Sequence, residues 1–311
     1  REIEKLGYKI LATEDGKVTF LGDEHAIARA NLWLRTADRV LIKMAEFKAL
    51  EFEELFQQIK GIPWEEWIPE DGHFVINGSS VKSKLSSVPA IQSVSEKAIV
   101  NRLGEFYNVS HFEKSGAKYD IKITLLKDRV TVTLDTTGPG LNKRGYRKLI
   151  GEAPLKETMA AAMIELSFWN SGRILADPCC GSGTIPIEAA LIGRNIAPGL
   201  SRNFASENWD SINKEVWKEE RRKAFSEIDN DIENISMDNT ALAAQLKEYL
   251  EWHYIKCNDL PDEDAVVWGY DGNAYCCCTY RNGDFLAQNS DGEWINVAII
   301  AWIELPICID E

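Results

Sequence analysis

The residues best suited to chemistry lie between Arg173 and Ile192, in the string R-I-L-A-D-P-C-C-G-S-G-T-I-P-I-E-A-A-L-I. Its opening apolar run, Ile174–Ala176, predicts a short buried strand. Asp177 and Pro178 would end that strand. The string therefore places a carboxylate at a strand end, immediately before a glycine-rich turn.

The turn is Gly181-Ser182-Gly183-Thr184, and residues 185–192 after it predict a helix. Two glycines let a ligand approach the backbone closely. A strand, a glycine turn and a helix N-terminus together form the arrangement that holds nucleotide-like ligands in open α/β sheets.

The spacing excludes two common ligands of such turns. A phosphate-binding P-loop needs a Lys after its second Gly, and none follows Gly183. The dinucleotide fingerprint needs a third Gly, and Pro186 occupies that position. What remains suits a ligand with ribose and amino-acid groups and no phosphate, such as S-adenosylmethionine. The pattern alone leaves an ordinary strand-helix turn equally open.

The charge is unevenly distributed along the chain. The net charge of 311 residues is −14, yet residues 72–150 hold 13 Lys and Arg against 6 Asp and Glu. Residues 238–311 hold 3 against 14. One basic segment in an acidic chain is a candidate footprint for a polyanion, although a solvated mixed surface is an equal alternative.

Two motifs in the basic segment favour contact with phosphates. Lys82 and Lys84 alternate with small polar residues in S-S-V-K-S-K. The second motif, L-N-K-R-G-Y-R-K, supplies cations around an aromatic ring that could stack on a base. Its candidate contacts with RNA are Lys143, Arg144, Tyr146 and Arg147. A solvated linker is the alternative.

Hydrophobic periodicity predicts the elements that position these motifs. The expected helices cover residues 25–34, 52–59, 89–107, 156–168 and 217–229, and the expected strands include 8–12, 17–21, 40–47, 74–77, 119–126 and 129–135. On the helix at 156–168, Met159, Ala162, Met163 and Leu166 are expected to face inward. Short strands between D-G-N, R-N-G and S-D-G turns predict a small antiparallel sheet near the end of the sequence.

Composition narrows the class of protein. With 45% hydrophobic and 27% charged residues, it is that of a globular protein. No apolar run approaches the roughly 20 residues of a membrane span. The seven cysteines include no C-x-x-C and make no zinc pattern with the histidines. We expect no metal, no membrane partner and a reduced, cytoplasmic setting.

Several longer strings together resemble one family. They are A-I-A-R-A-N-L-W-L-R-T-A-D-R-V from Ala26, S-V-K-S-K-L from Ser80, K-R-G-Y-R from Lys143, A-P-L-K-E-T from Ala153 and D-P-C-C-G-S-G-T-I-P-I-E-A-A from Asp177. The chain from Arg1 to about Asp231 resembles bacterial THUMP-domain class I RNA methyltransferases, which modify guanine N2 of large-subunit ribosomal RNA. Members are often labelled N6-adenine-specific DNA methylases.

The resemblance implies a fold and a function. It implies an α+β ferredoxin-like and THUMP N-terminal region, a truncated α/β Rossmann-like methyltransferase core, and then a small antiparallel β domain. The units would be a ferredoxin-like segment without its first strand (1–60), a THUMP domain (61–150), a partial methyltransferase domain (151–237) and a helix with a β-meander (238–311). The N-terminal units would hold ribosomal RNA.

The same resemblance implies a cofactor and the residues that hold it. The cofactor would be S-adenosylmethionine, and its methionine side would lie against Asp177, Pro178, Gly181, Ser182, Gly183 and Thr184. The last 70 or so residues resemble a small Trp-rich domain of unknown function.

Two departures from the family bear on activity. The family's next strand ends in G-Y-D-I-D, whose acidic residue binds the ribose, whereas this chain has N-I-S-M-D-N ending at Asn239. The family's N-P-P-Y-type loop, which orients the target amine, has no counterpart in the 311 residues. Three functions stay open: a methyltransferase impaired by the missing loop, a non-catalytic RNA-binding protein, and a truncated or recombined product without activity. No catalytic residue is assigned.

Overall fold

The computed structural model describes residues 1–147, 155–177 and 180–229, and beyond them the backbone of six short strands. The chain begins with α1 (Glu2–Lys5), the antiparallel pair β1 (Ile10–Glu14) and β2 (Lys17–Phe20), and α2 (Glu24–Trp33). The Asp23 side chain caps α2, because its Oδ1 accepts a hydrogen bond from the amide of Ala26 at 2.9 Å. The helix predicted at 25–34 is thus present and begins one residue earlier.

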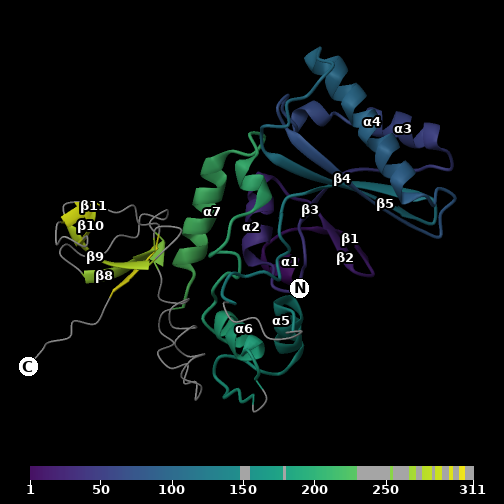
Figure 1. Cartoon of the computed structure of the whole chain (residues 1–311). Helices are drawn as coiled ribbons and strands as arrows, with labels where there is room; N and C mark the ends of the chain where they lie inside the picture. Colours follow the sequence, from purple (N-terminus) through teal and green to yellow (C-terminus); the bar gives the residue numbers. More distant parts are fainter. Residues whose placement is uncertain are drawn as a thin grey trace, which may run out of the picture.

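A four-stranded mixed sheet follows. Its order is β3 (Leu41–Lys48), β6 (Arg129–Asp135), β5 (Lys118–Leu126) and β4 (His73–Val81), and only the β4–β5 pair is parallel. The helices α3 (Phe52–Lys60) and α4 (Val88–Tyr107) cover one face (Figure 1). Alternate residues of β5 are fully buried, as period-two patterning predicts for a strand with one face in the core. The strands and helices predicted here form within a few residues of the expected bounds.

The next segment is helical. It contains α5 (Glu157–Leu166), α6 (Thr184–Gly193), the short 3-10 turn η2 (Ala205–Asn208) and α7 (Lys214–Ser226). Helices α5 and α6 pack on each other, whereas α7 packs on α2 (Figure 1). Among the described residues of 155–229, none forms a strand.

Two predictions for this helical segment are wrong. Ile174–Ala176 is not a strand, and Ile174 is 98% exposed, because no described strand pairs with this stretch and an unpaired strand gains no ladder hydrogen bonds. On α5 the residues Met159, Met163 and Leu166 point to solvent instead of inward. The inward face carries Ala160 and Ala161.

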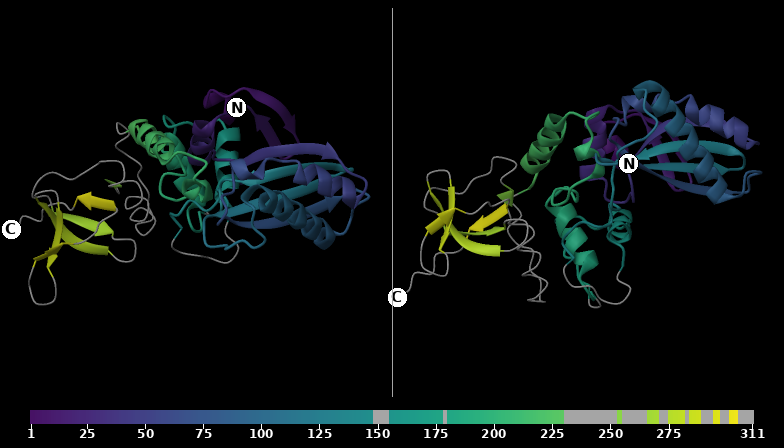
Figure 2. Two further views of the ribbon diagram at one scale, coloured as in Figure 1. Left: turned by 90° about the horizontal axis from the view of Figure 1, so that it is seen from above. Right: turned by 45° about the horizontal axis from the view of Figure 1, so that its top comes forward.

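Towards the end of the sequence six strands pair into a third sheet (Figure 2). They are β7 (His253–Tyr254), β8 (Val266–Tyr270), β9 (Tyr275–Arg281), β10 (Asp284–Gln288), β11 (Trp294–Asn296) and β12 (Ala301–Glu304). Their order is β11-β10-β9-β8-β12-β7, and all neighbouring strands in it are antiparallel. Their side chains lie outside the described residues, as does the predicted core of Trp268, Trp294 and Trp302.

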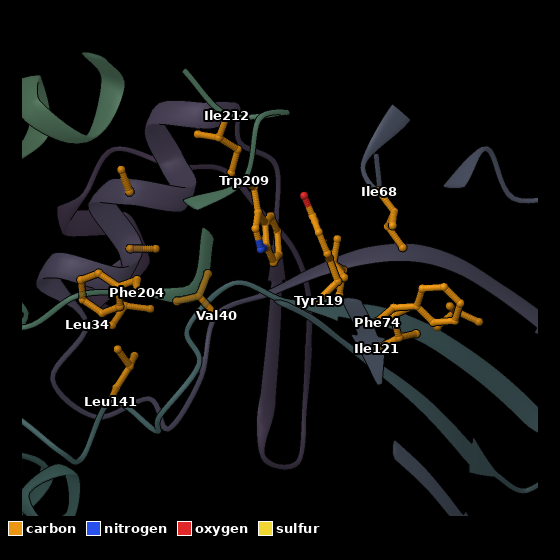
Figure 3. Close-up of a cluster of buried hydrophobic side chains, with 14 of the residues drawn as sticks. Leu34, Val40, Ile68, Phe74, Tyr119, Ile121, Leu141, Phe204, Trp209 and Ile212 are labelled. Atoms are coloured by element: carbon orange, nitrogen blue, oxygen red, sulfur yellow. The ribbon is translucent and has the colours of Figure 1, made fainter. Parts of the chain in front are cut away.

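The segment after α6 is anchored on the mixed sheet by aromatic stacking. The ring of Trp209 stacks on Tyr119 of β5 with centroids 4.9 Å apart (Figure 3). The indole N–H of Trp209 also donates to the carbonyl of Lys118 at 3.0 Å. Phe204 stacks in the same way on Trp217 of α7, at 5.3 Å. Residues 204–217 therefore join α7 to β5.

The Trp209 contact gives the first testable prediction. Trp209→Ala should lower the free energy of unfolding by about 3–5 kcal/mol, because it removes a fully buried ring and its hydrogen bond. Urea denaturation followed by fluorescence of the remaining tryptophans measures the change. Phe106→Ala is the matched control, since that ring is 59% exposed, and it should cost less than about 0.5 kcal/mol. Equal losses in the two variants would show that Trp209 does not anchor this segment.

Candidate cofactor and nucleic-acid sites

The glycine turn has the backbone geometry that a ligand site needs. Gly181 and Gly183 have φ angles of +53° and +74°, in the left-handed region that side chains disfavour. Gly183 is the N-cap of α6, and the amide of Ile187 donates to its carbonyl at 2.9 Å. A Cβ atom added at Gly181 would meet nothing within 4 Å, so the turn borders open space. The amides in the first turn of a helix lack helical partners and can bind a carboxylate, so a turn of this geometry before α6 fits an anionic group.

Some side chains around the turn already make hydrogen bonds to other groups of the protein. Thr184 is buried, and its Oγ1 accepts a hydrogen bond from Nη2 of Arg147 at 2.7 Å. The Ser182 and Thr184 hydroxyls lie 3.4 Å apart. Asp177 is half-buried directly after residues 174–176, and Pro178 lies outside the described residues. The fit to an amino-acid ligand therefore rests on the backbone of the turn more than on its side chains.

Beneath the turn lies a buried ionic cluster. Glu188 of α6 is fully buried, and its Oε1 accepts from Nε of Arg144 at 3.3 Å and from the hydroxyl of Tyr146 at 3.0 Å. The Arg144 guanidinium also donates to the carbonyl of Leu141 at 2.7 Å and to the carbonyl of Arg35. Burial raises the pKa of Glu188 despite these cations, and it lowers the pKa of Arg35 to about 10.

This cluster corrects part of the predicted RNA site. Arg144 is 1% exposed and Tyr146 is also buried, so neither side chain reaches a surface that RNA could contact. Arg147 is engaged as well: it donates to the carbonyl of Leu155 and to Thr184, and it forms an ion pair with Glu157 at 3.3 Å. The sequence pattern did not distinguish two possibilities, because a cation next to an aromatic residue can bind a buried carboxylate as well as a phosphate.

The other predicted cations are accessible. Lys143 is exposed on the same loop whose Arg144 is buried. Lys82 and Lys84 are exposed just after β4, where Lys82 adopts a φ of +50°. The loop is held by short contacts: the amide of Lys84 donates to Oδ1 of Asp128 at 2.6 Å, and the amide of Asp128 donates to Oγ of Ser83 at 3.0 Å.

The structure adds two cations that the sequence motifs did not include. Lys127 lies beside Asp128 in the turn between β5 and β6, and Arg129 begins β6. Both are exposed, and Arg129 forms an ion pair with Glu46. The parallel register pairs Val81 with Leu126, which brings this turn beside the loop of Lys82 and Lys84. We call Lys82, Lys84, Lys127 and Arg129 the basic corner. Only the pairing of β4 with β5 could have revealed it, because the two loops are far apart in the sequence.

In the part of the chain that the structure describes, no helix combines the length and the apolar character that crossing a membrane requires.

Three family models match consecutive parts of the chain. They are the RlmL ferredoxin-like domain over residues 1–41, the THUMP domain over residues 49–135, and the RMKL-like methyltransferase domain over residues 144–268. These matches place the chain in a class of proteins that combine a ferredoxin-like and THUMP N-terminal region with an RMKL-like methyltransferase domain.

Relatives with curated names agree with this class. The chain is 52% identical over 223 residues to "Putative RNA methyltransferase YpsC" of Bacillus subtilis (strain 168), covering 71% of this chain and 58% of that protein. It is 37% identical over 219 residues to "Ribosomal RNA large subunit methyltransferase K/L" of Psychromonas ingrahamii, covering 70% of this chain and 29% of that protein. The chain thus spans less than two thirds of either relative.

Solved structures agree as well. A structure described as "a predicted N6-adenine-specific DNA methylase from Listeria monocytogenes" is 49% identical with a TM-score of 0.75, covering 79% of this chain and 67% of that one. Another, "SMU.472, a putative methyltransferase complexed with SAH", is 41% identical with a TM-score of 0.73, covering 80% and 68%. The chain belongs to the family of THUMP-domain, RlmL-like methyltransferases.

The buried cluster gives the second prediction. Arg144→Met should lower the free energy of unfolding by about 3–5 kcal/mol, because it leaves the Glu188 carboxylate buried without its cation. The double variant Arg144→Met with Glu188→Gln should recover at least half of that loss. Urea denaturation of the two single variants and the double variant completes the cycle.

Lys143→Ala is the matched control, since Lys143 precedes Arg144 in the sequence but has an exposed side chain, and it should change stability by less than about 0.5 kcal/mol. If Arg144→Met left stability unchanged but weakened RNA binding, Arg144 would belong to the RNA surface after all.

Proposed function

We propose that this chain is the RNA-binding and cofactor-binding part of an S-adenosylmethionine-dependent RNA methyltransferase. The observation that carries the proposal is the left-handed Gly181–Gly183 turn at the N-terminus of α6, in a chain of this methyltransferase family. A solved relative with 41% identity is complexed with SAH, the product that S-adenosylmethionine leaves after methyl transfer. The methionine carboxylate would lie against the first amides of α6.

The cofactor residues follow from the turn. Gly181, Ser182 and Gly183 supply the backbone approach, and Asp177 and Pro178 precede it. The role of Thr184 is to fix the turn, because its hydroxyl is held by Arg147. The complete domain would be Rossmann-like, with the strand at 174–176 paired in a sheet.

The substrate proposed is large-subunit ribosomal RNA, with guanine N2 as the methyl acceptor. The Psychromonas relative carries a name for large-subunit ribosomal RNA methylation. On this chain the basic corner and Lys143 supply the exposed cations. They would neutralise phosphates, which positions RNA without reading its sequence.

Methyl transfer itself requires more than these sites. An amine must be held in line with the sulfonium, and positioning of that kind supplies a large part of the rate. The 311 residues contain no N-P-P-Y-type loop to orient it. The chain by itself is therefore expected to bind cofactor and RNA but to transfer methyl groups poorly or not at all. A purely RNA-binding protein, the alternative, would show no cofactor binding.

The third prediction tests the cofactor. Titration of S-adenosylmethionine into the chain should release or absorb heat in a calorimeter, and Gly183→Val should weaken that binding at least about tenfold, because a β-branched residue is strained at a φ of +74°. Gly172→Val, at a glycine without a left-handed φ, is the control.

A tritiated-methyl assay on unmodified ribosomal RNA completes this test. We expect at most a trace of transfer by the chain, with YpsC as the positive control. Rapid turnover by the chain would contradict its catalytic impairment. Absence of cofactor binding together with RNA binding would instead support the RNA-binding alternative.

The fourth prediction tests the basic corner. Lys82→Ala with Lys84→Ala should weaken RNA binding and make the slope of log K against log salt shallower by about 1.4–1.8, since each lost phosphate contact removes about 0.7–0.9. Filter binding from low to moderate salt measures it. Lys214→Ala with Lys218→Ala removes two exposed lysines of α7 and should leave the slope unchanged. Identical slopes for both double variants would remove the basic corner from the proposal.

A further inference from the structure

A surface cavity lies where the first helices of the chain meet the helices that follow the mixed sheet. Its volume is about 280 Å³, close to the lower end of the range of about 300–1,000 Å³ that small-molecule sites occupy. Its wall combines residues from the stretches matched by the ferredoxin-like and the methyltransferase models. Ile192 lines it near the end of α6, whereas the Gly181–Gly183 turn precedes that helix. We call it the junction cavity, and it is separate from the candidate cofactor site.

A buried guanidinium group in the wall of the junction cavity lacks part of its hydrogen bonds. Nη2 of Arg35 donates to the carbonyl of Ile196 at 2.8 Å, but the buried Nη1 has no partner among the described residues. Burial lowers the pKa of Arg35 to about 10, although the carboxylate of Glu188 opposes this shift. A buried donor without an acceptor is costly. Its position in a cavity wall therefore points to an acceptor from outside the chain.

Helix α2 adds a second guanidinium group and an aromatic ring to the same wall. Arg29 and Trp33 are four residues apart, so they lie on one face of the helix. Nε of Arg29 donates to Oε2 of the buried Glu220 at 2.8 Å. The two terminal nitrogens of Arg29 make no hydrogen bond to any residue that the structure describes. The contact with Glu220 thus orients a guanidinium group whose outer donors stay available.

The carboxylates around the junction cavity are engaged elsewhere or exposed. Glu2 accepts hydrogen bonds from the amide of Arg35 at 2.7 Å and from the next amide at 3.3 Å. Glu165 forms an ion pair with Lys5 at 3.5 Å, and Glu227 is exposed. The buried and half-buried part of the wall is therefore left mainly with unmade donors, which favours an anionic ligand over a cationic one.

We propose that the junction cavity binds a small organic anion. Its carboxylate or phosphate group would be held by the guanidinium groups of Arg29 and Arg35, because arginine binds both kinds of oxyanion through charge-assisted hydrogen bonds. Its apolar body would lie against Trp33, Leu6 and Ile192. This site goes beyond the proposed function, since neither the glycine turn nor the basic corner contributes a residue to the wall.

Isothermal titration calorimetry on the full chain tests the site with two anions from different sources. The probes are phenylacetate and adenosine 5′-monophosphate, and the controls are their uncharged counterparts phenylacetamide and adenosine. We expect at least one anion to bind with a Kd below about 1 mM, and its uncharged counterpart to bind at least about tenfold more weakly. Failure of both anions to bind, or equal binding of the uncharged counterpart, would overturn the proposal.

Variants show whether the anion lies in the junction cavity. Arg29→Gln keeps a donor near Glu220 but removes the charge, and it should weaken binding at least about tenfold. Ile192→Glu places a carboxylate in the wall at a half-buried position and should weaken binding at least as much. Lys214→Gln, at an exposed lysine of α7, is the control and should leave binding unchanged.

Thermal unfolding shows which variants are folded, and the two cavity variants serve as independent tests. Binding that tolerates both Arg29→Gln and Ile192→Glu in folded protein would contradict the junction cavity as the site. Loss of anion binding in Gly183→Val, or in Lys82→Ala with Lys84→Ala, would assign the anion to the cofactor turn or to the basic corner and overturn the inference. Cofactor and RNA binding are measured separately, so the proposed function can fail while this site stands, and the reverse.

Discussion

The ion pair between Arg144 and Glu188 is the contact on which the arrangement of the described chain depends. Arg144 comes from the connection after β6, Glu188 from α6, and the carbonyl that accepts from Arg144 belongs to Arg35 after α2. Removing two charges from water is costly unless most of their hydrogen bonds are made, so the pair is stable in few geometries. Arg35 Nη1 and Glu188 Oε2 have no hydrogen-bond partner among the described residues, which adds to that cost. The cluster therefore adds little net stability. It fixes how the segments of Arg35, Arg144 and Glu188 lie relative to one another, because its hydrogen bonds form only in that arrangement.

Neutral hydrogen bonds extend this connection towards the mixed sheet. The side chain of Asn31 donates from Nδ2 to Oγ1 of Thr136 at 2.9 Å, and its Oδ1 accepts from Oγ1 of Thr137 at 2.8 Å. On α7, Glu220 lies within 2.9 Å of His25 and accepts from Arg29 at 2.8 Å, both on α2. Helix α7 belongs to the stretch matched by the methyltransferase model, yet it packs on α2 in the stretch matched by the ferredoxin-like model. The stretches matched by the ferredoxin-like and THUMP models and the described part of the stretch matched by the methyltransferase model therefore share one hydrophobic core.

Most helices and strands could be predicted from the sequence, because their periodicity is local and the core of one sheet decides which face is buried. The strands at 118–126 and 129–135 alternate so strictly that their register follows from the turn between them. Prediction failed where the outcome depends on distant partners. An arginine at position 144 could bind either a phosphate or a buried carboxylate, and the sequence alone does not show that its partner is Glu188 of α6. Lys127 gains its place beside Lys82 only through the parallel pairing of two strands far apart in the sequence. Ile174 has the pattern of a strand, but a strand forms only against another one.

The two sides of the glycine turn differ in the same way, because local contacts order its helix side whereas its strand side depends on a distant partner. Thr184 is held by Arg147, and Glu188, one helical turn further on, is held by Arg144 and Tyr146. One side of α6 is thus anchored to the connection after β6 at two successive turns, so the helix side of the turn is ordered without any sheet. Residues 174–176 on the other side belong to no strand in the described chain. A ligand at such a turn contacts both the end of a strand and the first amides of a helix. A cofactor at this turn would therefore meet an ordered helix side, and the residues that order it are Arg144 and Arg147, the cations of the motif that resembles an RNA-binding sequence.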